Sequence, residues 1–168
     1  MIVLETERLS IRHLTLDDAA FIEEIVNEPS FLENIGDRNV KNLDDARRYL
    51  TDGPLASYER NGFGLFAVAL KSTDAPIGMC GLIRRDTLPD VDIGYAFLPR
   101  YWGKGYGYES TAAMLQYGRE TRGLERIIAI VSPGNAASIK VLEKIGLVFD
   151  RMIDTPDGKA TALYVPAS

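Results

Sequence analysis

The feature that most constrains the fold is a single strand–helix–strand unit between residues 91 and 131. Val91 to Leu98 is an apolar run typical of a strand, and a glycine-rich stretch and a helical pattern to about Arg122 follow it. Arg126 to Val131 is then typical of a buried strand. Because such connections are right-handed crossovers, strands 91–98 and 126–131 are predicted to be parallel neighbours.

The remaining strands are predicted to pair in an antiparallel manner. Runs 64–70 and 77–84 precede strand 91–98 and are joined to it by short turns, which indicates a meander. Two closing strands, 147–154 and 160–165, flank the turn Pro156-Asp157-Gly158. An all-parallel doubly wound sheet does not fit, because only one crossover helix lies between strands that can be parallel.

The helices complete one mixed α+β domain spanning residues 1–168. Thr15 can cap a helix that Pro29 ends, residues 30–42 are expected to be irregular, and a helix from Asp44 to Tyr58 is broken near Gly53-Pro54. Asn135 caps a late helix that stops at Gly146. The sequence therefore predicts a central, mostly antiparallel sheet of about seven strands, with one parallel pair and about four flanking helices.

Composition narrows the range of partners. The net charge is −5 and no long Lys/Arg tract occurs, so nucleic acid is not expected as a partner. No apolar run is long enough to span a membrane. Cys80 is the single cysteine, which rules out an intramolecular disulfide and fits a reducing compartment. We expect a cytoplasmic protein without a metal site, present as a monomer or homodimer.

The stretch from Trp102 to Glu109 predicts an anion-binding site. A glycine-rich turn into a helix leaves backbone N–H groups without partners at the positive end of the helix dipole. Glycine also allows a phosphate to approach the backbone closely, and Lys104 and Arg100 add charge. A plain tight turn is the alternative. The spacing G-x-G-x-G is not the dinucleotide fingerprint, and the lysine followed by Ser/Thr of a P-loop is absent.

Three motifs in order resemble one family. Glu5 to Leu9 looks like its opening strand, Val91 to Tyr95 with Pro99 to Gly107 like its central strand and pyrophosphate loop, and Asn135 to Ser138 with Leu142 to Leu147 like its late helix. The chain thus resembles the GNAT superfamily of N-acetyltransferases, in particular the ribosomal-protein (RimJ/RimL-type) branch. Trp102 stands where the superfamily usually carries Arg or Gln, and this branch commonly carries Trp there.

The resemblance implies acetyl-CoA as co-substrate and an amine as acceptor. Strands 91–98 and 126–131 would splay apart, and the pantetheine arm would lie in the gap and bond the backbone there. Asn135 would also hold pantetheine, although it can serve as a plain helix cap. Lys140 and Lys144 would approach the CoA phosphates, or are solvated helix charges. The expected cofactor-binding residues are Phe97, Leu98, Trp102, Gly103, Lys104, Gly105, Tyr106, Gly107, Tyr108, Asn135, Lys140 and Lys144.

Two residues are the catalytic candidates. Asp92 is the expected general base, acting through water, with Asp90 on the same face in reserve. Its alternatives are an exposed strand residue or a charge that orients the amine. Ser138 is the expected donor to the leaving thiolate, or else an ordinary first-turn serine. Other possible donors are Tyr95, Tyr106 and Tyr108, and the only histidine, His13, is given no role. A backbone N–H near Phe97 or Leu98 is expected to stabilise the oxyanion.

The acceptor is left open by the sequence. Its site is expected between residues 30–42, the helix after them, the turn in 83–92 and the closing hairpin. Acidic residues there could attract a cationic amine, or simply form a solvated surface; they are Glu28, Glu33, Asp37, Asp90 and Asp92, with Phe31, Tyr58 and Phe63 as aromatic contacts. A protein N-terminus, amino acid, polyamine or aminoglycoside would all fit. Two competing interpretations are a non-catalytic acyl-CoA sensor of the same fold and an NAD-binding domain.

Overall fold

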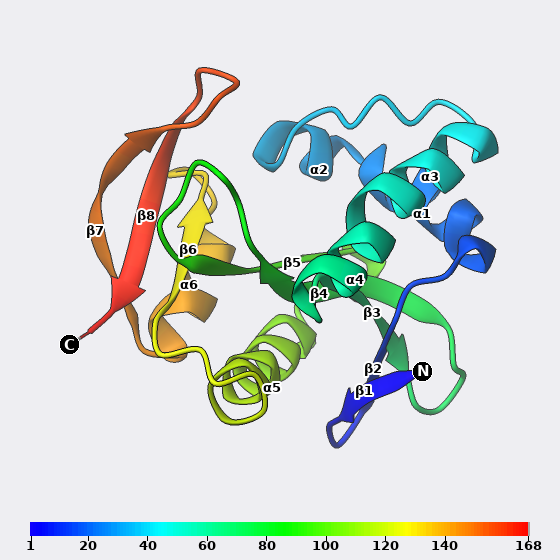
Figure 1. The fold of residues 1–168 in the computed structure, drawn as a ribbon, viewed down its shortest axis with the longest axis horizontal. Coiled ribbons are helices and arrows are strands. Elements are labelled where there is room, and N and C mark those ends of the chain that lie inside the picture. Colours follow the sequence, from blue (N-terminus) through cyan, green and yellow to red (C-terminus); the bar gives the residue numbers. More distant parts are fainter. Residues whose placement is uncertain (168) are drawn as a thin grey trace.

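A computed structural model describes residues 1–167. One eight-stranded sheet in the order β1-β2-β3-β4-β5-β6-β8-β7 forms its centre (Figure 1). Every neighbouring pair is antiparallel except β5 and β6, which are parallel as predicted. The strands are β1 (Ile2–Glu5), β2 (Leu9–Arg12), β3 (Leu65–Leu70), β4 (Pro76–Ile83), β5 (Val91–Phe97), β6 (Ile127–Val131), β7 (Leu147–Asp154) and β8 (Ala160–Pro166).

Helices cover both faces of this sheet (Figure 1). A capped 3₁₀ turn at Leu16–Asp18 leads into α1, and a π-helical turn at Thr51–Leu55 joins α3 to α4. No helix within residues 1–167 is long and apolar enough to cross a membrane. The α-helices are α1 (Ala19–Val26), α2 (Pro29–Asn34), α3 (Leu43–Leu50), α4 (Ala56–Asn61), α5 (Tyr106–Glu120) and α6 (Ala136–Lys144).

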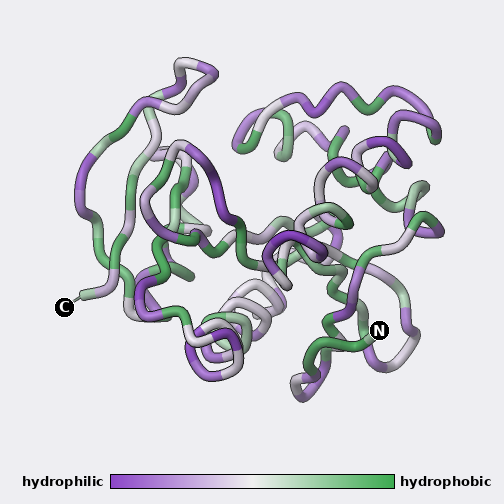
Figure 2. Tube along the Cα trace, viewed as in Figure 1, coloured by the Kyte–Doolittle hydropathy of each residue, from purple (hydrophilic) through white to green (hydrophobic). Residues whose placement is uncertain are grey.

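The core divides into two layers because side chains alternate along each strand. Phe66 and Val68 of β3 pack in the layer that contains Met114 of α5, whereas Ala67 faces the layer formed with α1 and α3. Figure 2 shows hydrophobic segments in the central strands and hydrophilic loops at the periphery. The two layers hold the sheet rigid around β5.

The sheet opens beside β5. Its pairing with β6 is confined to Val91 with Ile127 and Asp92 with Ile128. Beyond Ile128, β6 pairs on its other side with β8, from Ala129 to Val131. One edge of β5 is therefore free of a strand partner from Ile93 onward within the described chain, which is the splayed arrangement expected from the sequence.

The N-terminal strand differs from the prediction. Glu5 to Leu9 is not one opening strand: Glu5 ends β1, Leu9 starts β2, and the residues between them turn. The backbone of Thr6 donates to Leu9 O at 2.9 Å, and the Thr6 hydroxyl accepts from Leu9 N at 3.1 Å. The strand before this turn, β1, is the eighth strand of the sheet, where about seven were predicted.

The helices before β3 also need one correction. Pro29 does not merely end the first helix; it starts α2 at a position where its missing N–H costs nothing. Residues 30–42 are therefore not wholly irregular. The break near Gly53-Pro54 is confirmed, as the π-helical turn between α3 and α4.

Candidate active site

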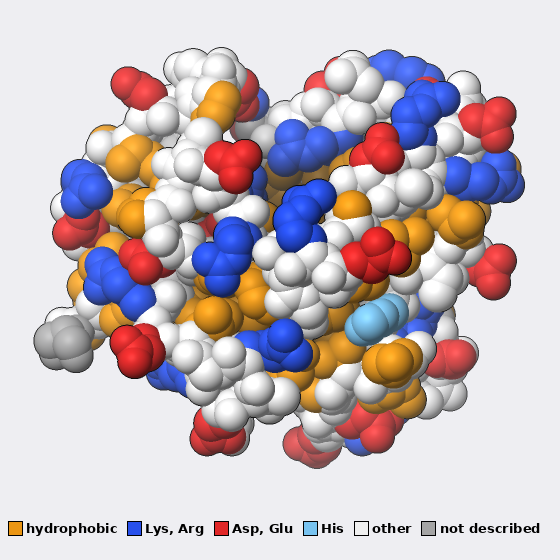
Figure 3. All heavy atoms as spheres, viewed as in Figure 1, with side chains coloured by type: hydrophobic (Ala, Val, Ile, Leu, Met, Phe, Trp, Pro, Cys, Tyr) orange, Lys and Arg blue, Asp and Glu red, His pale blue; other side chains and the backbone are white. Residues whose placement is uncertain are grey.

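A groove of about 1450 Å³ crosses the molecule at the open edge of β5. The splayed strands, α6 and the start of α5 line one part of it. The other part is lined by α2 to α4, the β4–β5 loop and the β7–β8 hairpin. In the space-filling view this groove is the hollow between two lobes (Figure 3).

Residues of the glycine-rich loop line the groove, and backbone amides there have no hydrogen-bond partner among residues 1–167. The first hydrogen bond of α5 is donated by Glu109 to Gly105 O at 3.0 Å, so the N–H groups of Tyr106, Gly107 and Tyr108 precede it. Gly103 and Gly105 have φ of +74° and +85°, a conformation that favours glycine. The loop thus presents amide donors at the positive end of a 15-residue helix.

A contact from the N-terminus fixes this loop. Glu109, in the first turn of α5, accepts from the Thr6 hydroxyl at 2.5 Å and from Arg8 N at 3.0 Å. Arg8 Nε also pairs with it at 2.7 Å, and the Arg8 guanidinium lies 4.4 Å from the ring centre of Tyr106. Partial burial alone would raise the pKa of the Glu109 carboxylate. The hydrogen bonds from Thr6 and Arg8 outweigh this effect, so the pKa of Glu109 is lowered. Thr6, Arg8 and Glu109 are called the N-terminal clamp below.

The open edge of β5 offers one backbone donor near the loop. Leu98 N donates to Ile77 O at 3.0 Å and Leu98 O accepts from Tyr101 N at 2.9 Å, so both backbone groups of Leu98 are occupied. Alternation in an antiparallel ladder then directs the N–H of Phe97 toward the gap. The carbonyl of Phe97 accepts from the Trp102 indole at 2.8 Å, which ties the loop to the strand.

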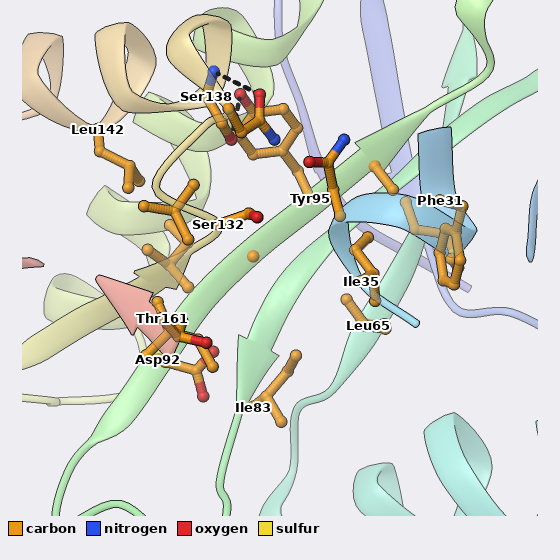
Figure 4. Close-up of a pocket in the computed structure, with 18 of the residues that line it drawn as sticks. Phe31, Ile35, Leu65, Ile83, Asp92, Tyr95, Ser132, Ser138, Leu142 and Thr161 are labelled. Atoms are coloured by element: carbon orange, nitrogen blue, oxygen red, sulfur yellow. Dashed lines mark hydrogen bonds between the residues drawn. The ribbon is translucent and has the colours of Figure 1, made fainter. Parts of the chain in front are cut away.

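A pair of hydroxyl groups lies beside this edge. Asn135 Oδ1 accepts from Ser138 N at 3.3 Å and caps α6. The Ser138 hydroxyl is hydrogen-bonded to the Tyr95 hydroxyl at 3.0 Å (Figure 4). Burial raises the pKa of Tyr95, with the bond to Ser138 opposing it, so the phenol is neutral at physiological pH. Because Ser138 donates to Tyr95, the Tyr95 O–H is the donor that the pair offers to the groove.

Asp92 lies on the opposite face of β5 from Tyr95. Its side chain is 1% exposed, and Oδ1 accepts from Arg85 Nε at 2.9 Å. Burial raises the pKa of Asp92, opposed by the charge and the hydrogen bond of Arg85. In Figure 4 Asp92 lies near Thr161, and Ser138 lies beyond Tyr95 at the other end of the strand. The acidic and hydroxyl groups thus border one groove without touching.

Sequence and structure comparisons identify relatives with the same architecture. A family model described as an acetyltransferase (GNAT) domain matches residues 8–148. The chain belongs to the GNAT family of N-acetyltransferases.

This chain is similar to several curated proteins and solved structures. It is 31% identical to an uncharacterized N-acetyltransferase, p20, of Bacillus licheniformis, over 86% of this chain and 82% of that protein. It is 37% identical to the uncharacterized protein YkkB of Bacillus subtilis, but that match spans only about half of each, 55%. An acetyltransferase of Agrobacterium tumefaciens superimposes with a TM-score of 0.83 at 25% identity, covering 98% and 94% of the two chains.

RimL-type proteins are among the structural neighbours of this GNAT chain. A ribosomal L7/L12 N-acetyltransferase, RimL, solved in complex with coenzyme A, superimposes with a TM-score of 0.84 at 14% identity. Coverage is 98% of this chain and 97% of that one. At this identity the likeness concerns the fold.

Most of the sequence-predicted cofactor residues of this GNAT chain line the groove. Two of them do not: Lys104 projects to solvent outside the lining, and Leu98 is buried with its backbone occupied. Arg100, expected to add charge to the loop, is paired with Glu24 at 2.8 Å. Those that line the groove are Phe97, Trp102, Gly103, Gly105, Tyr106, Gly107, Tyr108, Asn135, Lys140 and Lys144.

The catalytic candidates differ in their placement. Ser138, Tyr95 and Asp92 line the groove, as do the alternative donors Tyr106 and Tyr108. The reserve residue Asp90 precedes β5 and is paired with Arg126 at 3.1 Å, outside the lining. His13 stacks on Tyr58, with ring centres 4.3 Å apart, away from the groove.

The acids that line the acceptor side are mostly not the ones named from the sequence: Asp52, Asp154 and Asp157 line it together with Asp92. Of Glu28, Glu33, Asp37, Asp90 and Asp92, only Asp92 lines the groove, so the others form a solvated surface. Phe31 lines the groove; Phe63 and Tyr58 do not. The sequence-based prediction did not include the basic residues that line the acceptor side of the groove. The adjacent Arg84 and Arg85 after β4 were a sequence signal for them. The prediction also missed the N-terminal clamp, whose partners lie about a hundred residues apart.

Proposed function

We propose that this chain transfers the acetyl group of acetyl-CoA to a primary amine by direct attack of the amine on the thioester. The observation that carries the proposal is the row of unpaired amides from Tyr106 to Tyr108 beside the open edge of β5. The amides suit the diphosphate of CoA, and the open strand edge suits the amide-bearing pantetheine arm. The acceptor would be a protein N-terminus or a small-molecule amine.

The proposed cofactor contacts follow the groove. Gly103, Gly105 and the amides up to Tyr108 bind the diphosphate, with Trp102 holding the loop against β5. Asn135 and the second lone pair of the Phe97 carbonyl bind the pantetheine arm. Lys140 and Lys144 lie on the groove side of α6, in reach of the remaining phosphate charge. Lys104 acts only at long range, since it lies outside the lining.

The proposed chemistry needs a neutral amine, a donor for the oxyanion and a donor for the leaving thiolate. The amine nitrogen forms the new C–N bond and passes its proton to Asp92 through a chain of waters, because Asp92 lies toward the other end of β5 from Phe97. The N–H of Phe97 stabilises the oxyanion. The C–S bond then breaks, and the CoA thiolate accepts a hydrogen bond from the Ser138–Tyr95 pair before taking up a proton from solvent. Amine and thioester thus become amide and thiol.

One assay tests the proposal directly. The protein is incubated with acetyl-CoA and a panel of amines that includes peptide N-termini, and release of free CoA thiol is followed. Amine-dependent thiol release is expected, whereas binding of CoA without it would indicate the sensor alternative. The substitution Gly105→Val places a side chain at φ +85° and is expected to abolish CoA binding.

Ligand specificity gives a second, independent check. CoA should raise the melting temperature of the protein, and NAD and ATP should not. A shift with NAD alone would contradict the proposal. We propose that this activity takes place in the cytoplasm. The single cysteine, Cys80, is a buried free thiol, which fits a reducing compartment.

A further inference from the structure

One wall of the groove carries an excess of arginine that the transfer chemistry does not use. Arg38 follows α2, Arg60 lies near the end of α4, and Arg84 follows β4. All three line the groove on the side away from α6. Figure 3 shows Lys and Arg side chains gathered in the hollow between the two lobes. This wall is basic although the chain as a whole carries net charge −5.

These arginines differ from most others in the protein. Among residues 1–167, neither Arg38, Arg60 nor Arg84 has a carboxylate within ion-pair distance. The guanidinium of Arg84 lies over the face of Phe63, 5.8 Å from its ring centre. The arginines that do form ion pairs are Arg8, Arg12, Arg47, Arg48, Arg85, Arg100, Arg126 and Arg151.

The carboxylates on the same wall do not balance this charge. Asp92 is taken by Arg85, which leaves Asp52 beside the three arginines. The other acids that line the groove within residues 1–167, Asp154 and Asp157, belong to the β7–β8 hairpin, where Arg151 and Lys159 also line it. Like charges that line one cleft repel each other, and a cleft with low-dielectric walls strengthens their field. Guanidinium groups with free donors pair best with carboxylate or phosphate. The wall is therefore complementary to an anion.

The floor beneath the arginines is apolar. Figure 4 shows Phe31, Ile35, Leu65 and Ile83 on the side of β5 away from Ser138, and all four line the groove. A fully hydrated inorganic anion gains little from such a surface, whereas an organic molecule can cover it. The two features together suit a ligand with an apolar body and a negative group.

We propose that the acceptor amine carries a carboxylate or phosphate group elsewhere in the same molecule, and that Arg38, Arg60 and Arg84 bind it. This inference rests on the proposed acetyl transfer, because it assigns the ligand as the acceptor. The three arginines hold the negative end while the amine reaches toward β5. Polyamines and aminoglycosides, which carry only positive groups, are then poor acceptors.

The test compares acceptors that differ in charge and little else. Alanyl-glutamyl-glutamyl amide is compared with its glutaminyl and lysyl counterparts, and O-phosphoethanolamine with ethanolamine, so that carboxylate and phosphate are assessed separately. We expect kcat/KM to be at least about tenfold higher for the anionic member of one pair. This preference should shrink as salt is raised.

Variants of the arginines test whether these residues cause the preference for anionic acceptors. Arg60→Gln and Arg84→Gln should each lower kcat/KM for the anionic acceptor about tenfold and leave the neutral acceptor unchanged. Arg119→Gln is the matched control, since Arg119 is exposed, forms no ion pair with a described residue and lies outside the groove. Melting temperatures establish that all three variants fold.

Several outcomes would overturn the inference. Equal or better use of the neutral and lysyl acceptors would do so and would leave acetyl transfer intact. If no amine is acetylated, the acetyl-transfer proposal fails, and binding of the same peptides to the CoA-loaded protein by calorimetry then decides whether the wall binds anions. An equal affinity for glutamyl and glutaminyl peptides there would refute the anion site itself.

Discussion

At the scale of single residues, the hydroxyl groups of Ser138 and Tyr95 beside β5 are expected to act together. Ser138 and Tyr95 are hydrogen-bonded at 3.0 Å, so neither can be changed without altering the other. We expect Ser138→Ala and Tyr95→Phe each to lower kcat about tenfold, with little change in acetyl-CoA affinity, because Ser138 donates to Tyr95 and orients the Tyr95 O–H that donates to the thiolate.

The double variant tests whether the two hydroxyls act together. A network that acts as a unit gives a double variant only slightly slower than either single one. Steady-state kinetics of the four proteins measure this coupling. Additive losses would mean that the two hydroxyls act separately, and unchanged turnover in Ser138→Ala would remove this serine from the mechanism.

Asp92 makes a prediction about pH. Burial raises its pKa above the ordinary aspartate value, with Arg85 opposing the shift. If Asp92 is the base, it must be ionised, so kcat/KM falls as pH drops through this raised pKa. Asp92→Asn should lower kcat roughly a hundredfold and abolish that acidic limb.

The alternative role of Asp92 predicts a different pattern. In this role Asp92 is the buried partner that orients Arg85 toward the groove, since it accepts from Arg85 Nε at 2.9 Å. In that case Asp92→Asn would raise KM for the acceptor and keep the acidic limb. The pH profile of the variant, measured beside that of the wild type, separates the base from the positioning residue.

At the scale of elements, the N-terminal clamp couples the β1–β2 turn to the start of α5. Glu109→Gln weakens the pair with Arg8, and Thr6→Val removes one donor. Each change is expected to raise KM for acetyl-CoA about fivefold with kcat unchanged, because the amides before Glu109 lose a fixed position. Asp44→Asn, which breaks an exposed pair with Arg47, is the control.

Elements were predictable from the sequence where the signal was local. The helix cap at Thr15, the strand at 91–97 and the glycine-rich entry to α5 all follow from neighbouring residues, and the structure has each of them. The turn at Thr6 was missed although its hydrogen bonds with Leu9 are local, whereas its contact with Glu109, 103 residues away, leaves no local signal. Pro29 was misjudged because a proline that ends one helix can equally begin the next.

The candidate site, like the helices and strands, was predictable where the signal in the sequence was local. The loop amides depend on local glycines, and sequence reasoning found them. The basic wall depends on Arg38, Arg60 and Arg84, which three separate elements bring together. Acidic residues near them in sequence, such as Glu33 and Asp37, point away from the groove. Charge counted along the chain therefore does not show which charged residues line the acceptor side.

At the scale of the whole molecule, the sheet consists of two parts joined at one narrow place. Strands β1 to β5 form one part and β6 to β8 the other, and only Val91 and Asp92 pair across them. A ligand in the gap would bridge the two parts. Opening motions that release the ligand then become rarer by the factor 1 + [L]/Kd.

Hydrogen exchange measures this bridging. With CoA at 100 times its Kd, we expect exchange to slow by up to about a hundredfold in β6 and at the amides from Gly103 to Tyr108, where opening would expose the bound cofactor. Helix α3, which packs against α1 far from the gap, should change much less. The Gly105→Val protein provides the control, since it should show no slowing at all. Slowing confined to α3, or equal in both proteins, would mean that CoA does not bind between β5 and β6.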